Sequence, residues 1–359
     1  MSGNNVSTQG ATPASRGQEP GMDADRRKLL GGVAGVAAAL GAPRFAAAAA
    51  RYTLRLATWG SPKAPQVADF VAEFQNLVAQ GSRGSVQVQS FPAGSLVDER
   101  GVPSAIQSRV VDIALTTMGS WASIVPTAGA LNTVFFSPTG DRFEKIIGPG
   151  TPLFGTLDED MAKVGVRMLA TLYNGPVVVV SNFPMSTPAA FKGKTVRVFD
   201  RLTAQIVQTL GGAPSTIGVA DVYPALQRGT VKAAIGGLEG AIGLKEYEVG
   251  KDLLATNGLF GILMTGYVMN KASLDALPAN LQKVVLDAAY AAGRKASQAM
   301  VVAYNQELQE MQRHGMSVIE LQPKTAPYEA FGKALEPLSR KQQAGFQPAL
   351  VRQIIDAQR

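Results

Sequence analysis

Cysteine is absent from this chain of 359 residues, and histidine occurs only once, as His314. The absence of thiols excludes disulfide bonds, cysteine nucleophiles and thiolate metal sites. A lone histidine excludes the histidine pairs of zinc enzymes, and its position near a predicted helix end favours a surface role through the helix dipole. The sequence also lacks a Gly-x-Ser-x-Gly nucleophile motif. We therefore expect no catalytic residues, no metal site and no cofactor.

Charged residues are scarce, at 17% of the chain, and the formal net charge is +7. The longest basic run is Arg26 to Lys28, which is too short for the basic stripe of a nucleic-acid-binding protein. A mild positive charge instead favours anionic small molecules as partners. The hydrophobic content of 46% is sufficient for the cores of a two-domain protein.

Residues 1–50 have the layout of an export signal. A polar segment from Met1 to Pro20 cannot bury a core and is predicted to be disordered. Two adjacent arginines, Arg26 and Arg27, then precede an apolar stretch and a run of alanines. The apolar stretch, of roughly a dozen residues, is too short to span a bilayer core of ~30 Å. The pattern predicts a twin-arginine signal peptide and a periplasmic location, with an ordinary secretory signal or an uncleaved anchor as the alternative.

The next segment alternates between strand and helix patterns, which predicts a parallel sheet with right-handed crossovers. The expected strands are 52–59, 86–91 and 112–117, and the expected helices are 65–79 and 101–110. Ligands of such sheets bind beyond the carboxyl ends of the strands. This rule places Trp59 and the stretch 117–121, with Thr117, Met118 and Trp121, at the predicted site. For the two tryptophans, stacking on a ligand and packing between lobes remain equally open.

The remaining chain predicts a second lobe and a helix that bridges both lobes. Apolar strands at 166–173 and 177–180 predict a crossing between lobes, and 260–269 predicts the return crossing. Residues 279–315 form one helical pattern without proline, which at 1.5 Å per residue would extend for about 55 Å. We expect residues 51–174 plus about 262–300 in the first lobe and 175–261 plus about 301–359 in the second.

One arginine on a predicted strand of the second lobe, Arg197, is the principal binding candidate. Alternation along the strand 195–199 buries Val196 and Val198 and aims Arg197 at the opposite face. A guanidinium presents a planar fork of donors that matches a carboxylate and stays charged when enclosed. Without further information, an arginine on a strand is more often an exposed or ion-paired structural residue.

The stretch around Arg197 resembles the solute-binding proteins of TRAP (tripartite ATP-independent periplasmic) transporters. Their strand, turn and helix motifs correspond here to Lys192, Gly193, Arg197, Val198, Gly212, Ala213, Pro214, Val222, Tyr223, Ala225, Leu226, Gln227, Gly229 and Val231. The resemblance implies an α/β, two-lobed periplasmic binding protein of the Venus-flytrap type with a long helix spanning both lobes. It implies that Arg197 holds the carboxylate of an organic acid, which is passed to the subunits of an ion-gradient-driven membrane permease. Some members of the family bind their ligand with the help of a cation.

The chain departs from the family pattern at three places that bear on the ligand. The polar residues that usually follow the glycine of the helix motif are replaced by a small and apolar run that ends at Gly236. Val219 stands where family members often carry an aromatic residue, and Val177 stands where sialic acid receptors carry a second arginine. These positions predict a smaller or more apolar monocarboxylate in place of a polar sugar acid.

Two other classes of protein remain open at this point. A binding receptor for an ATP-driven importer or for a sensor would have the same two lobes. An enzyme exported by the twin-arginine route is supported only by the signal and by the two-lobed design, since no nucleophile, base and orienting group are recognisable together.

Overall fold

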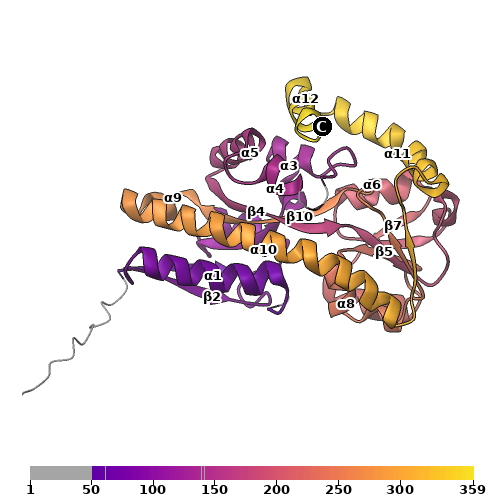
Figure 1. The fold of residues 1–359 in the computed structure, drawn as a ribbon, viewed down its shortest axis with the longest axis horizontal. Coiled ribbons are helices and arrows are strands. Elements are labelled where there is room, and N and C mark those ends of the chain that lie inside the picture. Colours follow the sequence, from indigo (N-terminus) through magenta and orange to yellow (C-terminus); the bar gives the residue numbers. More distant parts are fainter. Residues whose placement is uncertain (1–50, 61, 139, 141) are drawn as a thin grey trace, which may run out of the picture. The chain divides into compact units, whose positions relative to one another are not determined.

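The computed structural model describes residues 51–60, 62–138, 140 and 142–359, so the predicted export signal lies outside the described residues. The described chain forms two β-sheets, each covered by helices on both faces (Figure 1). Strand β4 (Val166–Pro176) of the first sheet leads directly into β5 (Val178–Ser181) of the second. The chain returns from β9 (Asp252–Ala255) of the second sheet to β10 (Ile262–Asn270) of the first. These two crossings define two lobes.

The first sheet has the strand order β2-β1-β3-β10-β4. Strand β1 (Tyr52–Ala57) pairs in parallel with β2 (Val86–Phe91) and β3 (Ile113–Thr117), while β10 runs antiparallel to β3 and β4. Helix α1 (Pro65–Gly81) connects β1 to β2, starts at a proline and buries the apolar face that its periodicity predicts. The carboxyl ends of β1 and β3 thus lie at one edge of the sheet, where the sequence placed the first-lobe contribution to the site.

The second sheet has the strand order β11-β9-β5-β8-β6-β7. Its parallel part consists of β7 (Ala213–Thr216), β6 (Thr195–Val198) and β8 (Ala233–Gly236). Strand β5 runs antiparallel to β8 and β9, and β11 (Ser317–Glu320) pairs with β9 at the edge. The helices of this lobe are α6 (Arg201–Thr209), α7 (Val222–Gln227), α8 (Leu238–Gly243) and α11 (Ala326–Ala344).

Shorter elements complete the first lobe and the connections. They are α2 (Val102–Gln107), η1 (Met118–Trp121), α3 (Pro126–Leu131), α4 (Arg142–Ile147), α5 (Pro152–Lys163), η2 (Pro188–Phe191), η3 (Val219–Asp221), η4 (Glu246–Glu248), α9 (Lys271–Asp275) and α12 (Pro348–Ala357). None of the helices in the described ranges is both long enough and apolar enough to cross a membrane.

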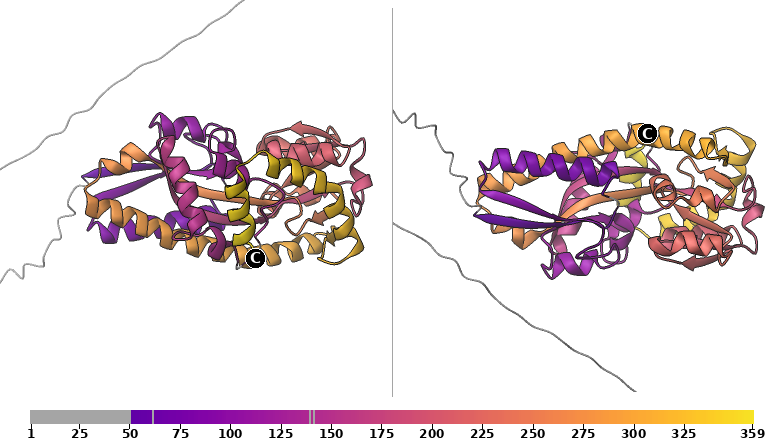
Figure 2. Two further views of the ribbon diagram at one scale, coloured as in Figure 1. Left: turned by 90° about the horizontal axis from the view of Figure 1, so that it is seen from above. Right: turned by 90° about the horizontal axis from the view of Figure 1, so that it is seen from below.

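Helix α10 (Ala279–Arg313) is 35 residues long and spans both lobes, as predicted. Its first half packs beside α1 and across β4, and its second half packs on α8 and β11 (Figures 1 and 2). The helix crosses β4 at Gly293, where an added Cβ would lie 2.6 Å from the Cβ of Ala170. The glycine therefore permits close approach of helix and strand.

The predicted assignment of the whole C-terminal segment to the second lobe is wrong for α12. Helix α11 packs on α6 of the second lobe, but α12 packs against α3 and α5 of the first (Figure 1). Ile354 of α12 is fully buried in the same apolar cluster as Leu153 and Leu157 of α5. The sequence shows that α12 has an apolar face but contains no signal for which lobe that face covers.

Candidate functional site

Arg197 lies in the middle of strand β6, and its two neighbours, Val196 and Val198, point to the opposite face of the sheet. Val196 and Val198 are buried in one apolar cluster, against α6 and α11. Arg197 shares the other face with its register partner Ala234, which belongs to the cluster under α7 and α8. The side chain is only 5% exposed. Strand alternation thus gives the direction of the guanidinium, and the covering helices bury it.

Two backbone carbonyls hold the guanidinium of Arg197 in a defined plane. Its Nε donates to the carbonyl of Ile217 at 3.0 Å, and its Nη1 donates to the carbonyl of Ile235 at 2.8 Å. Among the described residues, Nη2 has no hydrogen-bond partner. An added Cβ at Gly236 would come within 3.6 Å of Nη1. The guanidinium is therefore fixed through Nε and Nη1, and its Nη2 is available for a carboxylate.

Carboxylates from both lobes surround this buried cation. Burial lowers the pKa of Arg197, and the charges of Glu246, Glu99 and Asp200 oppose that shift. Burial raises the pKa of Glu246 to about 7, although the charge of Arg197 acts in the opposite direction. Burial likewise raises the pKa of Glu99, while the hydroxyl of Thr117 and the charge of Arg197 lower it. A clustering of perturbed groups like this one is characteristic of functional sites.

Two side-chain hydrogen bonds join the lobes near this cluster. Asn132, which follows α3 in the first lobe, donates through Nδ2 to Oδ2 of Asp200 at 2.8 Å. Asp200 also caps α6 by accepting from the backbone NH of Thr203 at 2.9 Å. Gln66 of α1 donates through Nε2 to Oε2 of Glu239 in α8 at 3.3 Å. In this conformation the two lobes are therefore in direct polar contact at two places.

The first lobe contributes groups at the carboxyl ends of its strands. Thr117 ends β3, and its hydroxyl lies 2.8 Å from that of Ser120. Trp59 follows β1 and packs partly buried against both apolar clusters of this lobe. The indole Nε1 of Trp59 is buried without a hydrogen-bond partner among the described residues. Trp59 can therefore donate a hydrogen bond to a ligand through Nε1, in addition to the ring stacking that the sequence suggested.

Two of the residues predicted for the site, Met118 and Trp121, lie in the core of the first lobe. Trp121 is fully buried in the first-lobe core and donates to the hydroxyl of Thr116 at 2.9 Å, so packing, and not ligand stacking, accounts for it. Met118 lies in the same core. Val177 is buried in the core of the second lobe, next to Val178, the register partner of Gly236. Val219 is 44% exposed on η3, two residues from Ile217. For these two positions contact with a ligand stays a prediction.

Sequence reasoning missed most of the polar residues at the junction. They are Gln66, Glu99, Asn132, Asn174, Asp200, Glu239, Glu246 and Thr265. Asp200 carried a usable signal, since an aspartate directly before a helical pattern predicts a cap at that position. Gln66 and Glu239 are separated by 173 positions, so no local pattern could have paired them. Within the part of the chain that the structure describes, no group of three or more His, Cys, Asp or Glu residues could hold a metal ion.

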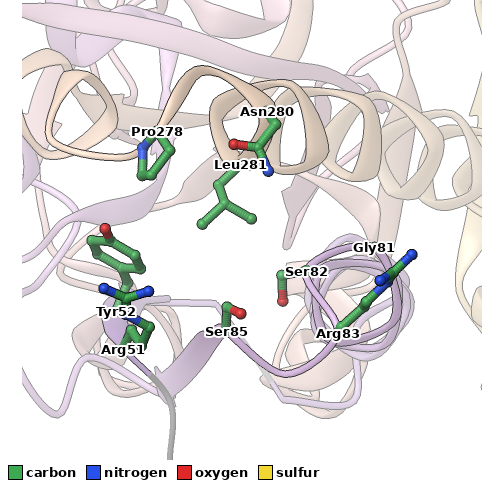
Figure 3. Close-up of a pocket in the computed structure, with 9 residues that line it drawn as sticks. All are labelled: Arg51, Tyr52, Gly81, Ser82, Arg83, Ser85, Pro278, Asn280 and Leu281. Carbon is green, nitrogen blue, oxygen red and sulfur yellow. The ribbon is translucent and has the colours of Figure 1, made fainter. Parts of the chain in front are cut away.

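A surface pocket of 510 Å³ lies away from Arg197, at the amino end of β1 and the start of α10 (Figure 3). Its lining residues are Arg51, Tyr52, Gly81, Ser82, Arg83, Ser85, Pro278, Asn280 and Leu281. The pocket opens at the amino edge of the first sheet, whereas Trp59 and Thr117 lie at its carboxyl edge. It is therefore separate from the cluster around Arg197.

Comparisons with known proteins agree with this arrangement. Residues 56–345 match the sequence model of the family described as bacterial extracellular solute-binding protein, family 7. A solute-binding protein of Sulfitobacter sp. NAS-14.1 is 28% identical over 69% of this chain and 72% of its own length. The C4-dicarboxylate-binding periplasmic protein of Rhodobacter capsulatus is 25% identical over 79% of this chain and 88% of its own. A TRAP periplasmic solute-binding protein of Roseobacter denitrificans with bound β-D-glucuronate has the same fold, with a TM-score of 0.76 at 20% identity over 85% of this chain and 99% of its own.

Proposed function

The chain belongs to the bacterial extracellular solute-binding protein family 7, and from that premise we propose that it captures a small organic acid anion and delivers it to a TRAP-type permease. The observation that carries the proposal is the geometry of Arg197. Two carbonyls fix its plane, its Nη2 has no partner among the described residues, and it is 5% exposed. A carboxylate is the ligand that such a preplaced cation binds best, because burying an anion without a partner is costly.

Closure of the two lobes over the anion follows from the same geometry. The bonds of Asn132 to Asp200 and of Gln66 to Glu239 can form only when the lobes are close together. A ligand that contacts groups of both lobes binds the closed arrangement better and shifts the population towards it. In this proposal the protein acts as a receptor and not as an enzyme, and it works in the periplasm after export through the twin-arginine signal.

Calorimetric titration of the protein with a panel of carboxylates tests the proposal. The variant Arg197→Ala should lose at least about a hundredfold in affinity, or ~3 kcal/mol, because it removes one partner of a buried charge pair. Arg228→Ala provides a matched control, since Arg228 is an exposed arginine at the end of α7 in the same lobe. Thermal unfolding of both variants checks that the fold persists. Unchanged affinity in Arg197→Ala would show that the anion binds elsewhere.

The type of permease needs a separate measurement. Uptake of the bound acid into vesicles that contain the partner permease should depend on an ion gradient and not on ATP. Uptake that requires ATP would instead support the alternative receptor of an ATP-driven importer.

A further inference from the structure

Three side chains at the lobe junction have buried polar atoms without partners. They are Gln66 (Oε1), Asn174 (Oδ1) and Thr265 (Oγ1), and their residues are 1%, 6% and 0% exposed. Buried side-chain polar atoms are paired in the large majority of cases, and an unpaired one is destabilising. The indole Nε1 of Trp59 adds an unpaired donor to these three oxygens. A concentration of unpaired atoms in one region indicates that something absent from the isolated chain supplies their hydrogen bonds.

Strand geometry and hydrogen bonds connect two of these side chains, Thr265 and Gln66. Thr265 and Tyr267 lie two residues apart on β10 and so share a face of the sheet. The hydroxyl of Tyr267 donates to the backbone carbonyl of Gln66 at 3.0 Å, and the amide of Gln66 bonds to Glu239 of α8. Thr265 is also the register partner of Thr117 on the neighbouring strand. The hydroxyl of Thr265 and the amide of Gln66 therefore belong to the same side of the first sheet as the predicted site residue Thr117.

Asn174 lies near the end of β4, on the face of the sheet that Thr265 and Tyr267 share. Leu172, two residues earlier, is the register partner of Thr265 and belongs to the same apolar cluster as Tyr267, so alternation along β4 gives Asn174 this direction. In this part of β4 the register with β10 shifts only beyond Tyr173. Nδ2 of Asn174 lies 4.0 Å from the position of a Cβ at Gly237. Neither polar atom of the Asn174 amide bonds to another described side chain or backbone group.

The turn formed by Gly236 and Gly237 links these groups to Arg197. A Cβ at Gly236 would lie 3.6 Å from Nη1 of Arg197, and Gly237 lies beside Asn174. Glu239, the partner of Gln66, is two residues further along the chain. Gly236 adds no side chain beside the guanidinium, whereas the side chain of Leu263 packs on Gly237, with its Cδ2 2.9 Å from the position of a Cβ there. One ligand can therefore contact Arg197 with one end and the unpaired polar atoms with the other.

The chemistry of the unpaired atoms limits what that other end can be. We propose that Gln66, Asn174 and Thr265 bind hydroxyl groups of the ligand, so that the ligand of the Arg197 site is a hydroxylated organic acid. Each amide oxygen needs a donor of its own and the indole NH needs an acceptor, and a hydroxyl donates one hydrogen bond and also accepts. A methyl or methylene group would leave all of these atoms unpaired. A second carboxylate would place its acceptor oxygens against the two amide oxygens, which are acceptors too, so no hydrogen bond could form between them.

This proposal rests on the proposed function and revises one expectation from the sequence. The expectation of a more apolar monocarboxylate came from positions 177, 219 and 231–236, all in the second lobe or at its border. The unpaired oxygens of Gln66 and Thr265 belong to the first lobe, and that of Asn174 belongs to the crossing strand. The polar part of the site therefore comes from elements outside the motif around Arg197.

Matched pairs of acids that differ by hydroxylation provide the test, in calorimetric titrations of the full chain. Suitable pairs are malate with succinate, lactate with propionate, and gluconate with hexanoate. In at least one pair the hydroxylated acid should bind more than tenfold more tightly, because a site built to pair a hydroxyl discriminates strongly against its absence. The variant Thr265→Val, which keeps the shape of the side chain, should lose about tenfold in affinity for that acid and leave the affinity for its partner unchanged.

The thermal stability of Thr265→Val gives a second readout. Because the hydroxyl of Thr265 has no partner among the described residues, its removal should leave the Tm unchanged or raise it. Thr171→Val is the matched control, since Thr171 is an equally buried threonine on β4 whose hydroxyl bonds to the carbonyl of Ile147 at 2.8 Å. That variant should lower the Tm and leave the preference for the hydroxylated acid intact.

The possible results separate the two proposals. If carboxylates bind and hydroxylation makes no difference in any pair, resident water satisfies the unpaired atoms, and the hydroxyl proposal is overturned while the proposed function stands. If Thr265→Val weakens both members of a pair equally, the threonine acts on the fold and not on the hydroxyl, and the proposal is again overturned. If no carboxylate binds to the unmodified protein, the proposed function itself fails.

Discussion

Glu246 provides a direct test of the electrostatics around Arg197. This glutamate is 6% exposed in η4, and burial raises its pKa from an ordinary 4.5 to about 7, with the charge of Arg197 opposing the shift. Between these two values the folded protein holds a proton that the unfolded chain has released. The contribution of Glu246 to the free energy of unfolding therefore falls as the pH rises from about 4.5 to 7 and is constant above that range. The full difference amounts to about 3 kcal/mol, at 1.36 kcal/mol for each unit of pKa.

The variant Glu246→Gln makes this contribution measurable, because an amide has nearly the shape of the protonated acid and carries no charge. At pH 4.5 the variant and the unmodified protein should have equal free energies of unfolding. At pH 8 the variant should be more stable by about 3 kcal/mol, since it no longer buries an ionised carboxylate. Urea denaturation at intervals of one pH unit gives the comparison. Glu248→Gln removes the same charge from a more exposed position of η4 and corrects for the effect of net charge.

A difference between the variant and the unmodified protein that stays constant from pH 4.5 to pH 8 would refute this reasoning. It would mean that Glu246 ionises as readily in the folded protein as in the unfolded chain. The balance of charge around Arg197 would then have to be reconsidered, because Glu246 would be a full counterion for the guanidinium.

Two further predictions concern packing and closure. Gly293→Ala should destabilise the protein by about 1–3 kcal/mol in urea denaturation, because the new Cβ would overlap that of Ala170. Gly155→Ala in α5 is the control: this glycine has open space around it, so the variant should stabilise the protein by up to about 1 kcal/mol. If both variants gain stability, the crossing of α10 and β4 is looser than described. Asn132→Ala should weaken ligand binding about tenfold and increase the radius of gyration in X-ray scattering, because it removes a bond between the lobes to Asp200; unchanged scattering and affinity would contradict that role.

Much of the fold could be predicted because its determinants are local. The long proline-free helical pattern gave α10 within a few residues, and strand alternation gave the direction of Arg197. The carboxyl ends of β1 and β3 followed from the order of strands and helices, which located Trp59 and Thr117. These features depend on the period of the apolar residues and on the rules that connect parallel strands.

The polar lining of the site could not be predicted, because its determinants are distant in the sequence. The pair Gln66 and Glu239 exists only because α1 and α8 meet at the lobe junction. Asn174 on β4 lies beside Gly237, 63 positions later in the chain, and no local pattern brings these two residues together. Trp59 and Trp121 both follow strand ends, yet one keeps an unpaired indole NH and the other is satisfied inside the core. Which of two similar tryptophans is satisfied depends on the side chains that the tertiary fold brings beside it.

The return of α12 to the first lobe has a mechanical consequence for any opening motion. The lobes are tied by the β4–β5 and β9–β10 crossings, by α10, and also by the short link 345–347 between α11 and α12. Near this link, Gln342 accepts from the backbone NH of Val134 in one lobe at 3.1 Å and donates to Gln205 in the other at 3.0 Å. Four connections restrict the rotation of one lobe against the other more than the two crossing strands alone would. Rotation of one lobe against the other therefore has to change the path of residues 345–347 or break the two hydrogen bonds of Gln342.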